Sequence, residues 1–361
     1  MKKKLRVAIL FGGKSAEHEI SLISARNIVD AMDKKKYEVV AIGIDKQGRW
    51  HLDEDARLLG GKDQSKVEFS DARNAAAVLP GETATPMVRP TGGGFGAVDV
   101  VFPILHGPFG EDGTVQGLLK LANLPFVGAG VLGSAVGMDK DVMKRLLRDS
   151  KIPIPKFLAF ERSDNISFTK VKKALGMPLF IKPANLGSSV GISKVSKPTE
   201  FSAAVKEAFR YDNKIVIEEF IRGREIECSV LGNEKPIASL PGEIIVNREF
   251  YSYDAKYIDD QGARLEIPAK LPKRVVKNVR EMALRAYQAL CCEGMARVDF
   301  FVKVNGRVIV NEINTIPGFT KISMYPKMWA ASGISYSKLI DRLIQLAIQR
   351  HRSEKRLKTS V

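Results

Sequence analysis

Cysteine and histidine are scarce in this sequence, which has three of the first and four of the second among 361 residues. Cys228, Cys291 and Cys292 form no CxxC or paired pattern, and two adjacent cysteines are poorly placed to bridge each other. The spacing excludes a disulfide framework as the basis of the fold. We therefore expect a reducing, cytoplasmic location.

The sequence also lacks a long, clean hydrophobic run. The opening MKKKLRVAILF is basic and then apolar, like a signal peptide, but Arg6 precedes a short apolar part that runs into a Gly-Gly-Lys turn. The charge-free stretch 121–138 contains Pro125, an asparagine and four glycines, which favours strand, turn and helix over a membrane span. We expect a first strand at the N-terminus and no membrane association.

Acidic residues are fewer than basic ones, and the formal net charge is +16. Such a charge invites a nucleic-acid hypothesis, but the lysines and arginines are spread along the chain without a basic stripe or a binding motif. The one dense basic cluster, HRSEKRLKTSV, is typical of a frayed helix and a solvated tail. Anionic small molecules such as ATP are the expected partners, and a nucleic-acid binder is the remote alternative.

Length and patterning predict an α/β protein of two or three domains. LRVAILF, YEVVAIGI and VDVVFPIL are strand-like, and a helix with Ser15 as its N-cap, reaching Met32, separates the first two. This β-α-β order implies a parallel sheet with right-handed crossovers. Residues 60–97, which are polar and contain Pro and Gly-Gly-Gly, are expected to form an irregular or hairpin insertion.

Gly128, Gly130 and Gly133 match the G-x-G-x-x-G pattern of dinucleotide-binding proteins. That pattern also needs a second strand ending in an acid about 20 residues further on. The nearest candidate, Glu161, lies 28 residues beyond Gly133. An NAD-dependent oxidoreductase is therefore a weak alternative, and tight turning with close packing is the simpler explanation.

The segment MARVDFFVKVNGRVIVNEIN predicts two strands joined at Asn305-Gly306, a dipeptide that favours hairpin turns. Side chains alternate along a strand, so Glu312 and Asn314 point to the same face. A hairpin about this turn pairs positions whose numbers sum to about 611, which places Asp299 opposite Glu312. Three oxygen donors without His or Cys suit Mg²⁺ or Mn²⁺, and the alternative is a solvated face with an incidental acid pair.

A divalent metal implies a polyphosphate, and three features could hold one. Lys182 ends the strand-like PLFI, Lys140 opens a helix, and residues 185–191, NLGSSVG, offer backbone N–H groups and hydroxyls. The glycine-rich segment is not a G-x-x-x-x-G-K-[ST] loop, and alone it could equally be a flexible turn. Together with Lys182 and the hairpin, it predicts a lid over phosphates.

Eight stretches of the sequence are recognisable together and in order. They are GGKSAEHEISL, LHGPFGEDGTVQG, GMDKDVMK, IKPANLGSSVGISKV, VIEEFIRGREIECSVL, YSYDAKY, ARVDFF and VNEINTIPGFT. In these the chain resembles the D-alanine–D-alanine ligases of the ATP-grasp superfamily over nearly its whole length. The resemblance implies a three-domain ATP-grasp fold. An N-terminal, Rossmann-like parallel-sheet domain would cover 1–128, a central lid subdomain 129–221 and a C-terminal subdomain 222–361.

The resemblance implies that two D-alanines are joined through an acyl phosphate, with release of ADP and phosphate, for peptidoglycan precursor synthesis. Asp299, Glu312 and Asn314 match positions that hold two Mg²⁺ or Mn²⁺ ions on the ATP phosphates. Lys140 and Lys182 match the phosphate-contacting lysines. The other matching ATP-binding positions are Ser188, Ser189, Glu218, Glu219, Phe220, Ile221, Glu225, Lys256 and Asn311, with Glu225 at the ribose and 218–221 beside the adenine.

Catalytic positions are implied in the same way. Glu17 matches the residue that binds the first substrate's ammonium group. Ser188, Tyr257 and Glu17 match a hydrogen-bonded triad that spans the three domains, with Lys256 beside it on a mobile loop that closes over the site. Arg297 and the backbone N–H of Gly318 match the pair that stabilises the developing oxyanion.

Three further positions concern the amino-acid substrates. Ser323 matches the contact to the second substrate's carboxylate, and Met324 stands where many relatives have Leu, a volume-conserving change. His106 matches a residue beside the first substrate, and its alternative role is packing at the end of a strand.

The acceptor and the assembly are implied by resemblance alone. Relatives that make D-alanyl-D-lactate lack the Lys-Tyr pair or carry Phe at the tyrosine, so Lys256 and Tyr257 favour an amine acceptor. A D-alanine–D-lactate ligase is therefore the alternative within the superfamily. Homodimerisation is the habit of the family.

Overall fold

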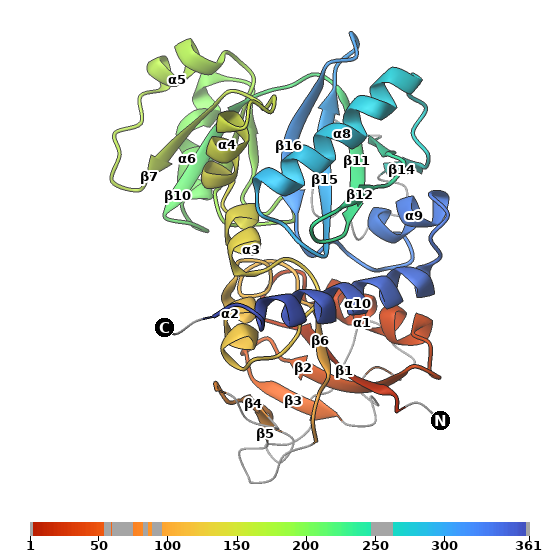
Figure 1. Ribbon diagram of the computed structural model, residues 1–361. Coiled ribbons are helices and arrows are strands. Elements are labelled where there is room, and N and C mark those ends of the chain that lie inside the picture. Colours follow the sequence, from red (N-terminus) through yellow and green to blue (C-terminus); the bar gives the residue numbers. More distant parts are fainter. Residues whose placement is uncertain are drawn as a thin grey trace.

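The computed structural model describes residues 3–53, 59, 75–81, 86–88, 96–246 and 263–358. Each of the three larger sheets lies in its own stretch of the chain, and Figure 1 shows the N-terminal sheet below the other two. A search of the described helices finds none with the length and apolarity needed to cross a bilayer.

The N-terminal sheet has the order β3-β2-β1-β6, formed by β1 (Leu5–Gly12), β2 (Tyr37–Ile44), β3 (Trp50–Asp53) and β6 (Val100–Ile104). β1 is parallel to both β2 and β6, which confirms the predicted β-α-β arrangement. α1 (His18–Ala31) and α2 (Thr114–Leu121) pack against this sheet. Inside the predicted insertion, the short strands β4 (Ala77–Val78) and β5 (Met87–Val88) form an antiparallel pair.

The start of α1 differs from the prediction. Glu17, not Ser15, is the N-cap residue, and it makes no side-chain capping bond. The Ser15 hydroxyl instead accepts the backbone N–H of Glu17 at 3.0 Å. The hydroxyl therefore holds the residue before the helix, and the Glu17 carboxylate is left to face the interior of the molecule, where it is 9% exposed.

The central sheet is antiparallel and has the order β7-β10-β8-β9. Its strands are β7 (Phe157–Glu161), β8 (Leu179–Pro183), β9 (Ser193–Val195) and β10 (Lys214–Glu219). α5 (Phe168–Leu175), the 3₁₀ turn η3 (Pro198–Glu200) and α6 (Phe201–Ala208) complete this part of the chain, with α5 and α6 burying their apolar faces against the sheet.

The C-terminal sheet runs β14-β13-β11-β15-β16, with β12 paired to β11. The strands are β11 (Arg224–Leu231), β12 (Ile237–Ala238), β13 (Gly242–Val246), β14 (Ala263–Glu266), β15 (Met295–Val302) and β16 (Val308–Asn314). α8 (Lys273–Ala289) packs along it, as Figure 1 shows.

The β15–β16 hairpin has the predicted register where chemistry is expected. Asp299 pairs with Glu312, and Arg297 pairs with Asn314. Towards the turn the register shifts, so that Phe300 pairs with Val310 and Asn311 is left as an extra residue. Such a bulge bends a strand and re-aims its side chains, a feature that the sequence pattern did not predict.

Helices cross between the three units. α3 (Val131–Met138) and α4 (Lys140–Asp149) meet at Asp139, and their buried side chains join the core of the C-terminal sheet. α9 (Met324–Ala331) and α10 (Tyr336–Glu354) end the chain, and α10 buries one face in the core of the N-terminal sheet. Packing therefore links stretches that the ranges 1–128, 129–221 and 222–361 separate, and this division stays a prediction.

The glycine pattern at 128–133 is explained by packing. A Cβ on Gly133, inside α3, would lie 2.6 Å from the carbonyl oxygen of Cys291. Gly128 has φ +97°, and its backbone lies against Gly294, whose own Cβ would be 3.1 Å from the Gly128 oxygen. The glycines thus allow backbone to approach backbone, which is the simpler of the two explanations offered by the sequence.

Candidate active site

Five polar side chains share one face of the C-terminal sheet. Arg297 donates to both oxygens of Asp299, from Nε and Nη2, at 2.7 Å each. Its Nε also lies 3.0 Å from Oε2 of Glu227 on the neighbouring strand β11. Glu312 and Asn314, on β16, pair across from Asp299 and Arg297. The guanidinium is thus fixed between two carboxylates, next to the predicted metal ligands.

A buried group of opposite charges lies where the central and C-terminal sheets approach each other. Glu218, on β10, is 3.0 Å from Nζ of Lys182 through one oxygen and 3.1 Å from Nζ of Lys144 through the other. Lys144 also donates to the backbone oxygen of Asn311, the bulge residue of β16, at 3.1 Å. The Glu218 carboxylate therefore forms ion pairs with two lysines. One, Lys182, was predicted to contact phosphate, and the other, Lys144, was not predicted to be a site residue.

Burial and the neighbouring charges shift the pKa values of the residues in this group. Burial works against the ammonium of Lys182, but Glu218 and Glu312 outweigh it and raise the pKa of that lysine. Burial favours the neutral form of Glu218, but the two lysines outweigh it and lower the pKa of the carboxyl. For Lys140 and Lys144 burial dominates and lowers the pKa. Burial disfavours the charged form of all three lysines, so a polyanion bound here would stabilise their ammonium groups.

The glycine-rich segment 185–191 follows β8 and reaches the N-terminal unit. Ser188 and Ser189 have φ of 51° and 61°, the left-handed conformation that side chains seldom adopt. Nζ of Lys140 donates to the Leu186 carbonyl at 2.5 Å. A Cβ on Gly187 would lie 3.4 Å from Oε2 of Glu17, so the segment passes directly over that carboxylate.

His106 and Glu111 are buried beside Glu17. His106 donates from Nδ1 to the Ile316 carbonyl at 3.0 Å, and its Nε2 has no hydrogen-bond partner among the described residues. Burial lowers the pKa of this imidazole, which keeps it neutral. Glu111 accepts the Gly107 N–H at 2.7 Å, and burial, helped by the Glu17 charge, raises its pKa to about 8. Glu111 was not among the site residues predicted from the sequence.

The predicted acceptor contacts lie on the segment between β16 and α9. Ser323 immediately precedes α9, and its hydroxyl accepts the Thr320 N–H at 2.9 Å. A Cβ on Gly318 would lie 2.9 Å from that hydroxyl, so the predicted oxyanion donor and the predicted carboxylate contact adjoin each other. Met324 is 5% exposed and packs with Met328 and Ile244.

The predicted adenine-side residues lie at the end of β10. Glu219 accepts the Lys156 N–H at 2.8 Å, and Ile221 is buried. Phe220 is 36% exposed, and its ring has Phe180 at 6.1 Å and the ammonium of Lys194 at 5.3 Å. Glu225, the second residue of β11, lies close enough to Lys182 to help raise the pKa of that lysine. Lys256 and Tyr257 lie outside the described residues.

The donor set fits a magnesium-like ion. Two carboxylates and one carboxamide, from Asp299, Glu312 and Asn314, supply hard oxygen atoms on one face. The Asn314 oxygen accepts the Ile316 N–H at 3.1 Å, which orients its side chain. A search of the described residues for three clustered His, Cys, Asp or Glu side chains finds none, and the predicted set itself has only two carboxylates.

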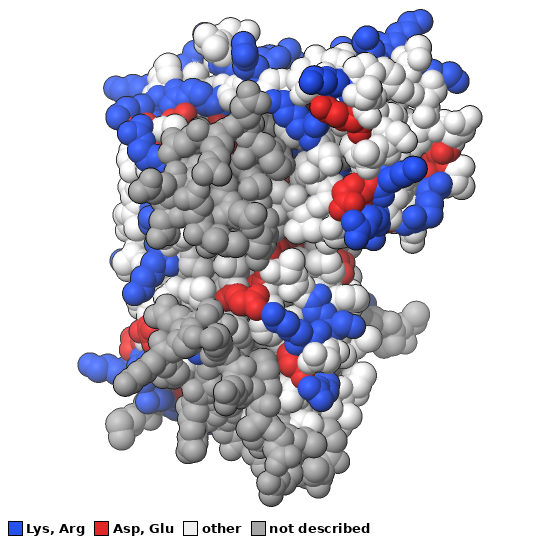
Figure 2. All heavy atoms as spheres, turned by 180° about the vertical axis from the view of Figure 1, so that it is seen from behind, with Lys and Arg blue, Asp and Glu red and all other residues white. Residues whose placement is uncertain are grey.

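Basic side chains do not gather at one place on the face drawn in Figure 2. Lysine and arginine side chains are dispersed among acidic and uncharged ones, mostly near the edges of the described surface. Among the residues that the structure describes, that face therefore shows basic side chains interspersed with acidic ones.

Comparisons with known proteins cover nearly all of this chain. Residues 6–129 match the family model described as D-ala D-ala ligase N-terminus, and residues 146–345 match D-ala D-ala ligase C-terminus. A D-alanine–D-alanine ligase of Shouchella clausii is 54% identical over 362 residues, which is 99% of this chain and 98% of the relative.

Solved structures agree with the sequence comparisons. A D-alanine–D-alanine ligase from Coxiella burnetii is 44% identical, with TM-score 0.87, over 98% of this chain and 96% of that one. The VanG D-Ala:D-Ser ligase from Enterococcus faecalis is 36% identical, with TM-score 0.85, over 96% of this chain and 100% of that one. The fold is therefore the ATP-grasp fold expected from the resemblance, and the chain belongs to the D-ala D-ala ligase family.

Proposed function

We propose that this chain joins two D-alanines into D-alanyl-D-alanine, using ATP and releasing ADP and phosphate, for peptidoglycan precursor synthesis. The observation that carries the proposal is the arrangement around Arg297, the buried lysines and Glu17. One sheet face offers oxygen donors, three buried lysines lie near Glu312, and the glycine-rich segment passes over Glu17. An NAD-dependent oxidoreductase would have no use for this set.

The nucleotide would lie between the central and C-terminal sheets. Lys140, Lys182 and the backbone of 185–191 would contact its phosphates, because they supply positive charge and N–H groups where both lysines are buried. Mg²⁺ or Mn²⁺ ions, two in each site, held by Asp299, Glu312 and Asn314, would neutralise phosphate charge during transfer. The buried lysines and the hairpin thus divide the binding of one polyphosphate.

The amino acids would lie on the other side of the glycine-rich segment. Glu17, at the start of α1, would bind the ammonium group of the first D-alanine and leave its carboxylate directed at the phosphate. Arg297 and the Gly318 N–H would stabilise the oxyanion that develops when the second amine attacks. The carboxylates of Asp299 and Glu227 restrict the Arg297 side chain and therefore favour one orientation of its guanidinium group.

The triad of Ser188, Tyr257 and Glu17 would close the site. The left-handed backbone at Ser188 directs that segment over the Glu17 carboxylate, and Lys256 and Tyr257 would follow from the C-terminal subdomain. Closure would exclude water from the acyl phosphate. His106, neutral and buried, would line the first D-alanine site.

The acceptor is the part of the proposal with a specific competitor. Lys256 and Tyr257 favour an amine over the hydroxyl of D-lactate, but D-serine also offers an amine, and one relative, 36% identical, is a D-Ala:D-Ser ligase. D-alanine, D-serine and D-lactate supplied together with Mg-ATP give products that mass spectrometry separates. We expect D-alanyl-D-alanine to dominate, and a majority of either other product would overturn this acceptor.

Cytoplasmic location and a homodimer complete the proposal. The three cysteines are all free, two of them buried, which suits a reducing compartment. Light scattering of the purified protein tests the dimer, because one chain of 39.8 kDa should then give about twice that mass.

A further inference from the structure

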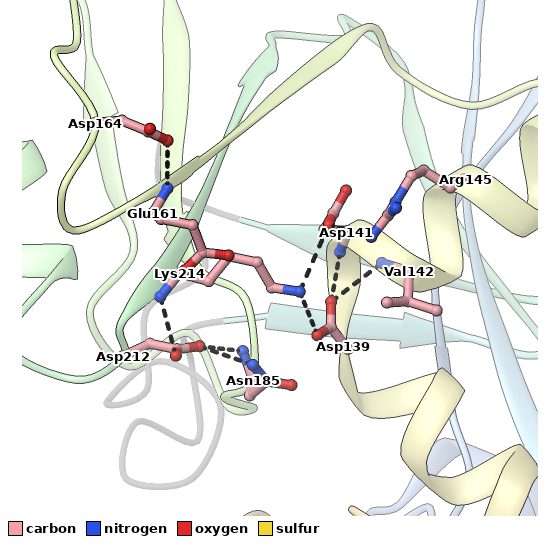
Figure 3. A network of polar contacts seen from close by, with 9 residues as sticks. All are labelled: Asp139, Asp141, Val142, Arg145, Glu161, Asp164, Asn185, Asp212 and Lys214. Carbon is pink, nitrogen blue, oxygen red and sulfur yellow. Dashed lines mark hydrogen bonds and ion pairs between the residues drawn. The ribbon is translucent and has the colours of Figure 1, made fainter.

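We propose that Asp212, two residues before β10, and Lys214, the first residue of β10, are positioning residues for the two proposed phosphate-binding segments. Asp212 would fix the start of the glycine-rich segment 185–191, and Lys214 would fix the start of α4, which carries Lys140. This inference rests on the proposed function, since it assigns the residues that hold its nucleotide site in shape. Figure 3 shows both residues reaching out from the same end of the strand.

Asp212 binds one residue of the glycine-rich segment twice. Its Oδ2 accepts the backbone N–H of Asn185 at 2.7 Å and the side-chain Nδ2 of Asn185 at 3.0 Å. Its other oxygen accepts the backbone N–H of Lys214 at 3.2 Å. A single carboxylate thus ties the residue that opens the segment to the strand beside it (Figure 3). Bonds to a charged acceptor are the stronger kind of hydrogen bond.

Lys214 makes the matching connection to α4. Its Nζ lies 2.6 Å from Oδ2 of Asp139 and 3.5 Å from Oδ2 of Asp141. Asp139 uses its other oxygen to cap α4, accepting the N–H groups of Asp141 and Val142 at 3.0 and 3.1 Å. The lysine therefore holds the capping carboxylate, and with it the first turn of the helix that presents Lys140.

Backbone bonds close the connection between these two parts. The Ala184 N–H donates to the Lys214 carbonyl, and the Lys140 N–H donates to the Ala184 carbonyl, both at 3.0 Å. Strand β10, the residue before the glycine-rich segment and the start of α4 thus form one hydrogen-bonded unit. The same turn supports the far end of the segment, because a Cβ on Gly191 would lie 2.7 Å from the ring of Tyr211.

The segment needs such support because its own conformation is unfavourable. Ser188 and Ser189 both have positive φ, and each costs on the order of a kilocalorie per mole unless the surroundings impose it. Without Asp212, the segment could relax and its N–H groups would no longer converge. The affinity for ATP should then fall more than the affinity for D-alanine, because D-alanine binding depends on Glu17 and Arg297.

The test compares Asp212→Ala with Asp164→Ala. Asp164 lies in the same subdomain and also accepts a backbone N–H, that of Glu161 at 2.7 Å, but in the turn after β7 (Figure 3). We expect Asp212→Ala to weaken Mg-ATP binding, measured by calorimetry without D-alanine, by roughly tenfold. The KM for D-alanine should change less than about twofold, and Asp164→Ala should leave both quantities within about twofold.

Two further variants separate positioning from a general loss of structure. Asn185→Ala removes one of the two bonds and keeps the backbone, so we expect a loss of ATP affinity smaller than that of Asp212→Ala. Lys214→Arg retains the ion pair with Asp139 and should preserve ATP affinity that Lys214→Met loses. Near-normal ATP affinity in folded Asp212→Ala would overturn the proposal, as would an equal rise in the KM for D-alanine.

The binding measurement also keeps the two proposals apart. If the protein binds Mg-ATP but shows no turnover with D-alanine, the proposed substrate is wrong while the comparison of Asp212→Ala with Asp164→Ala still decides the role of Asp212. If turnover occurs and both variants bind ATP normally, the function stands and the positioning role is wrong.

Discussion

Lys144 on α4 and Glu218 on β10 form an ion pair of 3.1 Å in which the side chains are 1% and 3% exposed. Glu218 pairs at the same time with Lys182, and Lys144 binds the backbone of Asn311 on β16. Lys144 therefore shares the Glu218 carboxylate with Lys182 and joins β16, the strand of the predicted metal ligands, to the central sheet.

Replacing Lys144 with Met should destabilise the fold and weaken ATP use together. Breaking a buried ion pair costs about 3–5 kcal/mol, and the remaining contact to Lys182 should reduce this toward about 2–3 kcal/mol. Chemical denaturation measures the cost, with Lys338→Met on the exposed face of α10 as a control expected within about 0.5 kcal/mol of the parent.

A double variant tests whether the pair is the cause. Lys144→Met with Glu218→Gln should cost less than the sum of the two single changes by about 1–3 kcal/mol, because the second change removes the charge that the first leaves underpaired. Strict additivity of the two costs would contradict the interaction.

Glu312→Gln should leave the fold intact and remove most turnover. The change keeps the shape of the side chain but takes away one metal-neutralising charge opposite Asp299. ADP release under saturating ATP measures it, and Glu281→Gln, on the exposed face of α8, is the charge-matched control. Near-parental activity of folded Glu312→Gln would show that this carboxylate holds no essential metal.

Glu111→Gln should change how stability depends on pH. The pKa of this carboxyl is raised from 4.5 to about 8 in the folded protein, so between these values the folded state keeps a proton that the unfolded state has lost. The parent therefore loses up to about 1.4 kcal/mol per pH unit over this window, a loss that the glutamine variant avoids. Below pH 4.5 the difference between the two should be independent of pH.

The measurement is the free energy of unfolding of both proteins at several pH values between 4.5 and 8. A difference that grows in favour of Glu111→Gln as pH rises is the expected result. A flat difference across the window would mean that Glu111 ionises normally when buried.

Gly133→Ala should destabilise the protein, whereas Gly117→Ala should not. A Cβ at 133 meets the Cys291 carbonyl at 2.6 Å, and such overpacking costs about 1–3 kcal/mol. A Cβ at 117, in α2, meets nothing within 4 Å and should gain about 0.5–1 kcal/mol of helix preference. Equal effects of the two changes would refute the packing explanation of the glycine pattern.

Local rules predicted the part of the site that local geometry builds. Alternation along β16 and the turn at Asn305-Gly306 were enough to place Asp299 opposite Glu312, since two strands joined by a short turn have few possible registers. The same rules missed the bulge at Asn311, because a single extra residue leaves the apolar alternation of a short strand almost unchanged.

Long-range contacts explain what was missed. Lys144 lies four residues after Lys140 on a helix rich in charge, and its burial depends on Glu218, 74 residues further along the chain. Asp212 is similarly 27 residues from Asn185. Ser15 was expected to cap α1 by residue preference, but its hydroxyl accepts the N–H of Glu17, and α1 begins only after that residue.

ADP release from Mg-ATP with D-alanine as the only amino acid, beside an L-alanine control, tests the proposed ligase activity itself. We predict release that requires D-alanine and is absent with L-alanine. The binding groups, which are Glu17, Arg297 and the Gly318 N–H, have fixed positions that would accept only one enantiomer. Release that is equal with the two enantiomers, or none from folded protein that binds ATP, would contradict the account and remove Glu17 and Tyr257 first from the proposed site.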